Sequence, residues 1–232
     1  MITLNSLWYY NENTEVEHLE DVAEQKAFTE KWLAYAREHN EKVWLVAHIS
    51  SGMGVFEPFN VWFSEIATEY QDIIKASFYG HTHRDEFYLN RDIHDEKRAP
   101  VHVNLVSAAF EGMGGNNPAV RLYEFDDETK EIINYTVFVA DLEKMAKSRK
   151  LEWEVMYQAK EQLGLSDLKP TTVLAWAEKM WDDDDAFQEY MRCYHTGYYT
   201  KGSCTGTCKV KALCSLLYVT SSDRDQCKKD HS

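Results

Sequence analysis

The stretch that decides the fold runs from Ile73 to Asp85 and reads IIKASFYGHTHRD. Its first part, Ile73–Tyr79, is rich in β-branched and aromatic residues and ends at Gly80, which is typical of a buried strand. The strand is followed at once by His81-Thr82-His83. In an open α/β sheet, ligand sites form beyond the carboxyl ends of strands, and an extended turn lets both histidines face the same side. On their own, these two residues are equally well explained as a pair of surface histidines.

A second histidine repeats this arrangement. Val43–Ala47 reads as a buried strand, and His48 follows it, leading into the small-residue loop Ile49–Gly52. Two histidine-bearing strand ends in one sheet can converge in space, and imidazole is a good ligand for zinc and iron-class ions. We therefore favour a shared metal site made by His48, His81 and His83 over three unrelated histidines.

The first 140 residues alternate strand and helix patterns, which predicts an α/β architecture. Strands are expected at residues 1–4, 42–48, 73–79, 101–108, 120–125 and 131–139, and helices at 15–39 and 56–70. From Asp141 the composition changes, and helices are expected at 142–163, 171–180 and 187–194. The sequence thus predicts residues 1–140 as one α/β part and 141–232 as a helical C-terminal subdomain.

The composition excludes several classes of protein. The chain has 232 residues, of which 44% are hydrophobic and 28% charged, so a packed core is expected rather than disorder. The net charge of −14 repels phosphate backbones and disfavours binding to a nucleic-acid polymer. The longest apolar runs, such as Val43–Ala47, are too short to cross a bilayer.

The five cysteines all follow residue 190. Their spacing contains no Cys-x-x-Cys pair, which favours a disulfide-stapled tail over a zinc site. Disulfides need an oxidising compartment, yet Met1–Asn13 has neither a basic region nor a long apolar region of the kind found in a signal peptide. We expect that an upstream part is missing from this chain.

Several segments together carry a resemblance to a known family. They occur in the order Leu4-Asn5, Tyr9-Tyr10, Trp32-Leu33, Ala47-His48, Phe78-Tyr79-Gly80-His81-Thr82-His83-Arg84-Asp85, Asn116-Asn117-Pro118-Ala119-Val120-Arg121-Leu122-Tyr123 and the cysteine tail. In this order the chain resembles the acid sphingomyelinases and acid sphingomyelinase-like phosphodiesterases. The Gly-His-Thr-His segment is shared across calcineurin-like metallophosphoesterases, while the Asn-Pro segment and the tail narrow the resemblance.

The resemblance implies that the chain is the C-terminal half of a metallophosphoesterase fold, with β-sheets flanked by helices, followed by a helical, disulfide-stapled subdomain. It implies two zinc ions in the complete enzyme, with His48 and His81 on one ion and His83 on the other. It also implies the pairs Cys204 with Cys208 and Cys214 with Cys227, which leave Cys193 free. No catalytic residue beyond the metal ligands is expected in this chain.

The family's other ligands lie in its N-terminal half: an Asp-x-His, a Gly-Asp-x-x-Asp and a Gly-Asn-His. The last two are absent here, and Asp92-Ile93-His94 imitates the first in the wrong order and context. Three neutral histidines offset none of the charge of two dications. We therefore expect this chain alone to bind at most one zinc and to be inactive.

The expected function is that of a secreted or lysosomal zinc-dependent phosphodiester hydrolase, present as a fragment. The expected substrate is a phospholipid head group or a nucleotide phosphodiester, and peripheral membrane contact is left open. The alternative is a non-catalytic truncated chain that serves as a binding module or holds one metal weakly.

Four further residues carry expectations of their own. Asn134-Tyr135-Thr136 is an acceptor sequon, and Asn134 either carries a glycan or is occluded in a strand. Arg121 is expected in a structural ion pair, His102 as a satisfied core histidine and Cys193 as a buried free thiol.

Overall fold

A five-stranded sheet forms the centre of the molecule. The computed structural model describes residues 1–52, 54–112 and 114–232. The strands lie in the order β1-β2-β3-β5-β4, with β1, β2, β3 and β5 parallel and β4 antiparallel to β5. Their bounds are β1 Ile2–Thr3, β2 Val43–Val46, β3 Ile74–Tyr79, β4 Glu86–Arg91 and β5 Pro100–Val106. The two strands that precede the histidines, β2 and β3, are therefore neighbours inside the sheet.

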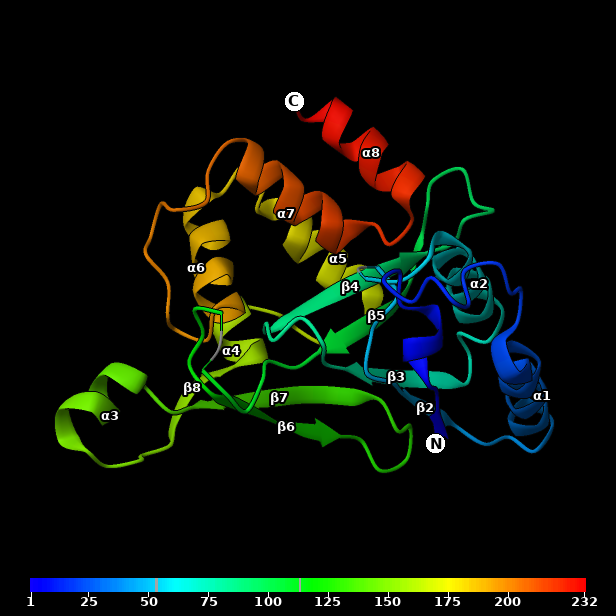
Figure 1. Ribbon diagram of the computed structural model, residues 1–232, viewed down its shortest axis with the longest axis horizontal. Helices are drawn as coiled ribbons and strands as arrows, with labels where there is room; N and C mark the ends of the chain where they lie inside the picture. Colours follow the sequence, from blue (N-terminus) through cyan, green and yellow to red (C-terminus); the bar gives the residue numbers. More distant parts are fainter. Residues whose placement is uncertain (53, 113) are drawn as a thin grey trace.

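Helices cover one face of this sheet. They are α1 (Gln25–Glu38) and α2 (Glu57–Glu69), which lie together in Figure 1. Leu33 from α1 and Phe59 and Phe63 from α2 share one apolar core with Leu45 and Ile74 of the sheet. The predicted helix at residues 15–39 is shorter than expected, because the Asp21 carboxylate accepts hydrogen bonds from the first-turn backbone N–H groups of α1.

A three-stranded antiparallel sheet and the C-terminal helices cover the other face (Figure 1). The strands are β6 Ala119–Phe125, β7 Ile132–Val139 and β8 Glu154–Gln158. The helices are α3 Leu142–Ser148, α4 Ala159–Leu163, α5 Pro170–Lys179, α6 Asp184–Tyr194, α7 Thr207–Leu217 and α8 Ser221–Asp230. The described residues also form two short 3-10 helices, Ser6–Tyr9 and Val22–Glu24.

The predicted helix at residues 142–163 is wrong. The chain leaves α3 at Arg149, which has a left-handed φ of 56°, and forms β8 before α4 begins. Tyr157 pairs with Val137 of β7 and is buried, so cross-strand packing outweighs the helical spacing of the apolar residues. Strand β4 was also not predicted; its charged first and last residues, Glu86 and Arg91, are both buried.

The mixed α/β class, the flanking helices and the stapled tail agree with the prediction. Disulfides join Cys204 to Cys208 and Cys214 to Cys227, and Cys193 is a buried free thiol, as the resemblance implied. One apolar core contains both sheet residues such as Leu105 and tail residues such as Leu213, so it extends across the predicted boundary at residue 140. Within the described parts of the chain, no helix is both long enough and apolar enough to span a bilayer.

Candidate metal-binding edge

The carboxyl ends of β2 and β3 bring His48 and His81 together. Their ring centroids are 5.2 Å apart, with the rings nearly perpendicular. The backbone N–H of Gly80 donates to the carbonyl of His48 at 3.0 Å, so the two loops are tied where they leave the sheet. This contact continues the parallel pairing of Val46 with Phe78, which lie two residues earlier along the two strands.

The turn after β3 is held in a conformation that few residues adopt. His81 and His83 have φ values of 76° and 62°, in the left-handed region that is uncommon for residues other than glycine. Such strain persists where the surroundings determine the conformation, and it often marks a functional site. A Cβ at Gly54 would lie 3.2 Å from His81 Nε2, and Gly54 itself has a φ of +75°. The loop after β2 therefore needs glycine where it passes the His81 ring.

The surroundings of His81 favour neutral imidazole, which is the form that binds metals. Burial lowers the pKa of His81, and the nearby His48 and His83 lower it further. Tyr10 packs its ring against His81 with centroids 5.2 Å apart. His48 and His81 thus form a two-imidazole face suited to one metal ion.

His83 contacts an acidic residue and an asparagine instead of the other two histidine rings. Its Nδ1 lies 3.2 Å from Oε1 of Glu111, and its backbone carbonyl accepts a hydrogen bond from the Asn116 side chain. Among residues 1–52, 54–112 and 114–232, no group of three or more His, Cys, Asp or Glu side chains is arranged to hold a metal. The described residues therefore bring two of the three predicted ligands together and do not by themselves complete a site.

An arginine network supports the His83 side of the turn. Arg84 donates to Nδ1 of His195 at 2.6 Å and to the carbonyl of Gly114 at 2.7 Å, and it also bonds the Asn116 side chain. Burial lowers the pKa of His195, and the adjacent Arg84 lowers it further. No pattern in the sequence relates His195 to Arg84, which lies 111 residues away.

Hydrogen bonds to Ser6, Asn60 and Arg224 fix the loop after His48. Ile49 N–H donates to Ser6 Oγ at 2.6 Å and Gly52 N–H donates to Asn60 Oδ1 at 2.8 Å. Arg224 of α8 donates to the Gly52 carbonyl, so the stapled tail reaches the loop that carries His48. These contacts fix the loop independently of any metal.

The predictions for His102 and Arg121 are confirmed, whereas the glycosylation of Asn134 stays a prediction. His102 lies within the sheet, 2.7 Å from Ser77 Oγ, and burial lowers its pKa to about 4. Arg121 forms a buried ion pair with Asp85. Asn134 is buried in the central strand β7, where its Oδ1 accepts from Lys160 N–H at 3.2 Å and its Nδ2 donates to Glu161.

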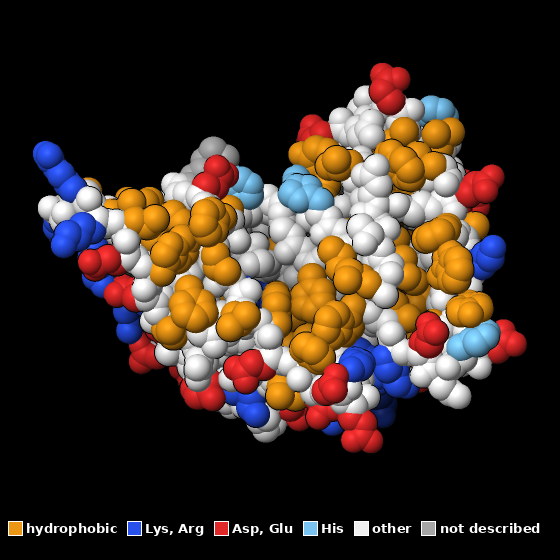
Figure 2. All heavy atoms as spheres, turned by 90° about the horizontal axis from the view of Figure 1, so that it is seen from below, with side chains coloured by type: hydrophobic (Ala, Val, Ile, Leu, Met, Phe, Trp, Pro, Cys, Tyr) orange, Lys and Arg blue, Asp and Glu red, His pale blue; other side chains and the backbone are white. Residues whose placement is uncertain are grey.

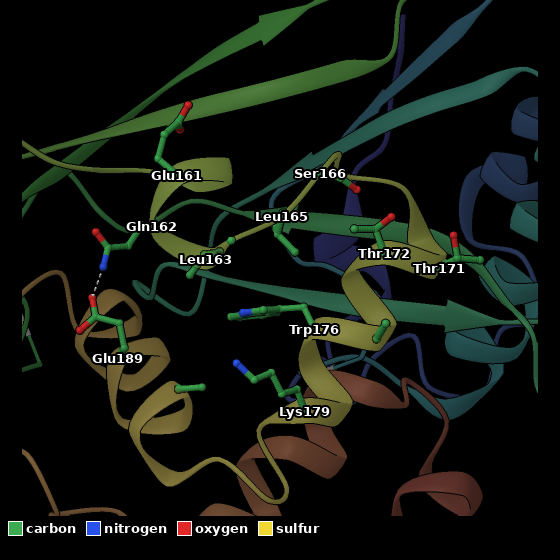
Figure 3. Close-up of a pocket in the computed structure, with 13 residues that line it drawn as sticks. Glu161, Gln162, Leu163, Leu165, Ser166, Thr171, Thr172, Trp176, Lys179 and Glu189 are labelled. Carbon is green, nitrogen blue, oxygen red and sulfur yellow. Dashed lines mark hydrogen bonds between the residues drawn. The ribbon is translucent and has the colours of Figure 1, made fainter.

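A large groove lies away from the histidines. It measures about 800 Å³ and runs between α4, α5 and α6. Figure 3 shows Trp176 extending from α5 into it, and Gln162 donating to Glu189 at 2.9 Å across one end. None of the three predicted ligands lines it, so groove size alone does not locate the candidate site.

Comparison with known proteins gives one consistent family. The model of the acid sphingomyelin phosphodiesterase C-terminal region matches residues 95–232. The chain is 30% identical over 215 residues to sphingomyelin phosphodiesterase 2 of Caenorhabditis elegans, covering 88% of this chain and 34% of the relative. It is 27% identical over 197 residues to sphingomyelin phosphodiesterase A of Dictyostelium discoideum, covering 84% and 33%.

A third relative carries a different substrate in its name. The chain is 25% identical over 244 residues to the human cyclic GMP-AMP phosphodiesterase SMPDL3A, covering 99% of this chain and 53% of the relative. The chain therefore spans between a third and about half of the length of these curated relatives.

Proposed function

The chain belongs to the family defined by the acid sphingomyelin phosphodiesterase C-terminal region, and from this premise we propose that it is the C-terminal part of a zinc-dependent phosphodiester hydrolase. The observation that carries the proposal is the contact between His48 and His81 at adjacent strand ends. His48 and His81 meet at the carboxyl edge of a parallel sheet, burial lowers the pKa of His81, and His81 has a left-handed φ. This combination fits a ligand site better than a purely structural role.

In this proposal His48 and His81 contribute to one zinc and His83 to the second. When bound, the metals would activate a water molecule and neutralise charge on the phosphodiester. The chain's own residues do the positioning: Gly80 ties the two histidine loops together, and Asn116 and Glu111 orient His83. The carboxylates that the site needs would come from another part of the protein.

The exposed face of the β6-β7-β8 sheet supports a role within a larger assembly. Figure 2 shows apolar side chains gathered over this side of the molecule, with histidine side chains at its rim. The exposed apolar residues include Val120, Leu122, Leu151 and Val155, together with the stacked pair Phe110 and Trp153. Extended apolar surface of this kind usually contacts another protein segment or a membrane.

The substrate class in this proposal is a small phosphodiester, either a phospholipid head group or a nucleotide. The relatives are named for both kinds of substrate, so the name of neither is transferred alone. The two disulfides favour an oxidising compartment, which fits a secreted or lysosomal protein.

The test begins with the chain as it stands. We expect residues 1–232 to bind at most about one zinc, measured by mass spectrometry, and to hydrolyse a chromogenic phosphodiester at acidic pH no faster than zinc alone. His81→Ala should remove the bound zinc, whereas His94→Ala, an exposed histidine elsewhere, should leave it unchanged. Two tightly bound zinc ions with turnover abolished by His81→Ala would show that this chain, or a second copy of it, completes the site.

The second arm uses the coding sequence upstream of Met1. If it encodes Asp-x-His, Gly-Asp-x-x-Asp and Gly-Asn-His, the extended protein should be active, and alanine at His48, His81 or His83 should reduce zinc content and turnover together. An active extended protein that keeps full activity in all three variants would contradict the proposed roles. A stop codon there would favour the alternative, a non-catalytic chain that binds a partner or one metal.

A further inference from the structure

A second cavity has a single carboxylate, that of Glu86, in its described lining. It measures about 500 Å³, within the usual range for small-molecule sites. We call it the tyrosine pocket. Its lining residues come from β4, α6 and the region of α7: Glu86, Tyr88, Tyr190, Met191, Tyr194, Cys204, Thr207, Cys208, Lys211, Ala212, Ser215 and Leu216. None of the three histidines lines it.

Glu86 is the unusual member of this lining. The residue is only 7% exposed, and its Oε1 is shielded from solvent with no hydrogen-bond partner among the described residues. Burial raises the pKa of Glu86 to about 7, although hydrogen bonds from Thr82 and Tyr88 oppose the rise. A buried carboxylate with an unsatisfied oxygen costs free energy unless a cation compensates it.

Three tyrosines surround this carboxylate. After burial, the charge of Glu86 is the largest influence that raises the pKa of Tyr88, Tyr190 and Tyr194. Their rings and the thioether of Met191 make the pocket wall apolar and polarisable. One carboxylate among aromatic rings is the composition that recognises an organic cation.

A metal ion fits the tyrosine pocket poorly. Calcium takes six to eight oxygen ligands, commonly from several carboxylates, and Glu86 is the single carboxylate in the described lining. Lys211 is exposed at the rim, where its charge is hydrated and adds to the cost of bringing in a dication. The lining therefore suits a ligand with one positive charge and an alkyl body.

We propose that the tyrosine pocket binds a small organic ammonium cation, with the Glu86 carboxylate as its counter-ion and the tyrosine rings around its alkyl groups. This site is separate from the histidine edge and does not depend on zinc. The proposal therefore stands or falls independently of the phosphodiesterase function.

The experiment is calorimetric titration of the folded chain with tetramethylammonium chloride at pH 8, with neutral 2,2-dimethylpropan-1-ol as the uncharged analogue. We expect saturable binding with a Kd on the order of 1 mM for the cation and at least tenfold weaker binding for the alcohol. Glu86→Gln, which keeps the shape and removes the charge, should weaken cation binding about tenfold or more. The matched control Glu65→Gln, exposed on α2, should bind as the unmodified chain does.

Two outcomes would overturn the proposal. One is the absence of saturable binding up to about 50 mM tetramethylammonium. The other is equal binding by the Glu86→Gln variant, or of the neutral alcohol, which would show that the pocket does not recognise charge. Circular dichroism of each variant checks the fold. Lys211→Met gives a second readout, because removing a positive charge from the rim should tighten cation binding severalfold.

Discussion

Asp85 and Glu86 are consecutive, both carry buried carboxyl groups, and their surroundings differ completely. Asp85 meets the Arg121 guanidinium, and the Tyr157 hydroxyl donates to it at 2.8 Å. Glu86 forms no ion pair among the described residues; the charge of Arg84 is the smallest of the effects on its pKa, and three tyrosines line the pocket around its carboxyl. Burial raises the pKa of both carboxyls, and for Asp85 the charge of Arg121 is the largest opposing effect.

The difference separates a structural carboxylate from a candidate binding carboxylate. The Asp85–Arg121 pair joins the segment after the histidine turn to β6 and, through Tyr157, to β8, so it fixes the packing of one sheet on the other. Glu86 does not join the two sheets in this way, so packing alone does not explain why the free-energy cost of burying its carboxylate is tolerated. Uncompensated buried charges with shifted pKa values cluster at functional sites.

The largest loss of stability should come from removing the charge of Asp85, which pairs with Arg121. Asp85→Asn leaves the Arg121 guanidinium buried without its counter-ion, and such losses cost about 3–5 kcal/mol. We expect urea-induced unfolding of this variant to show a loss of that size. The double variant Asp85→Asn with Arg121→Met should recover part of it, since no buried charge remains. A loss below about 1 kcal/mol for Asp85→Asn would show that water or another group compensates Arg121.

Removing the charge of Glu86 should increase the free energy of unfolding rather than decrease it. The folded-state pKa of Glu86 is about 7, against an ordinary value of 4.5, so the folded chain holds this proton more tightly than the unfolded chain does. The resulting penalty is absent below pH 4.5, grows as the pH rises through this window and reaches roughly 3 kcal/mol above pH 7. Glu86→Gln should therefore unfold at higher urea than the unmodified chain at pH 8 and at about the same urea at pH 4.

The effect of Glu86 on stability is measured as the difference in unfolding free energy between the unmodified chain and Glu86→Gln at each pH. His102 has a pKa lowered from 6.5 to about 4, so its contribution to stability falls as the pH drops through that window. It therefore opposes Glu86 in the pH profile of the whole chain, whereas subtraction of the two unfolding curves removes it. A Glu86→Gln variant that is less stable at pH 8 would show that the carboxylate makes a favourable contact.

The disulfides offer a test on the Glu86 side, because α7 forms one wall of the tyrosine pocket and both disulfides involve it. In the chain-entropy model, replacing Cys214 and Cys227 by serine should cost about 3 kcal/mol, and replacing Cys204 and Cys208, which close a shorter loop, about 2 kcal/mol. Thermal unfolding of the two double variants measures both losses. A larger loss for the shorter loop would indicate that native contacts, rather than unfolded-chain entropy, dominate.

The sequence predicted that His48 and His81 meet at one edge of the sheet, but it did not predict which residues contact Asp85. The reason is physical. His48 and His81 each follow a strand, and parallel strands place their ends at one edge, so local patterns sufficed. Arg121 and Tyr157 reach Asp85 from 36 and 72 residues away, and no local spacing reports such contacts. Strand β8 was missed because its apolar spacing also fits a helix, and pairing with β7 decided the outcome. The disulfide pairing came from resemblance, since spacing alone leaves it open.

The smallest expected effect concerns Asn134, a third buried polar side chain, whose Oδ1 and Nδ2 both form hydrogen bonds. Its Oδ1 accepts from the backbone N–H groups of Tyr135 and Lys160, and it lies in the central strand of a sheet. We expect no glycan there, so glycosidase treatment of the secreted chain should leave its gel mobility unchanged. The control is Asp127→Asn, which creates an Asn-x-Thr acceptor in the turn between β6 and β7, where the side chain at 127 is 94% exposed. That variant should gain a glycosidase-sensitive shift, and a shift in the unmodified chain would mean that Asn134 is modified before β7 pairs with its neighbours.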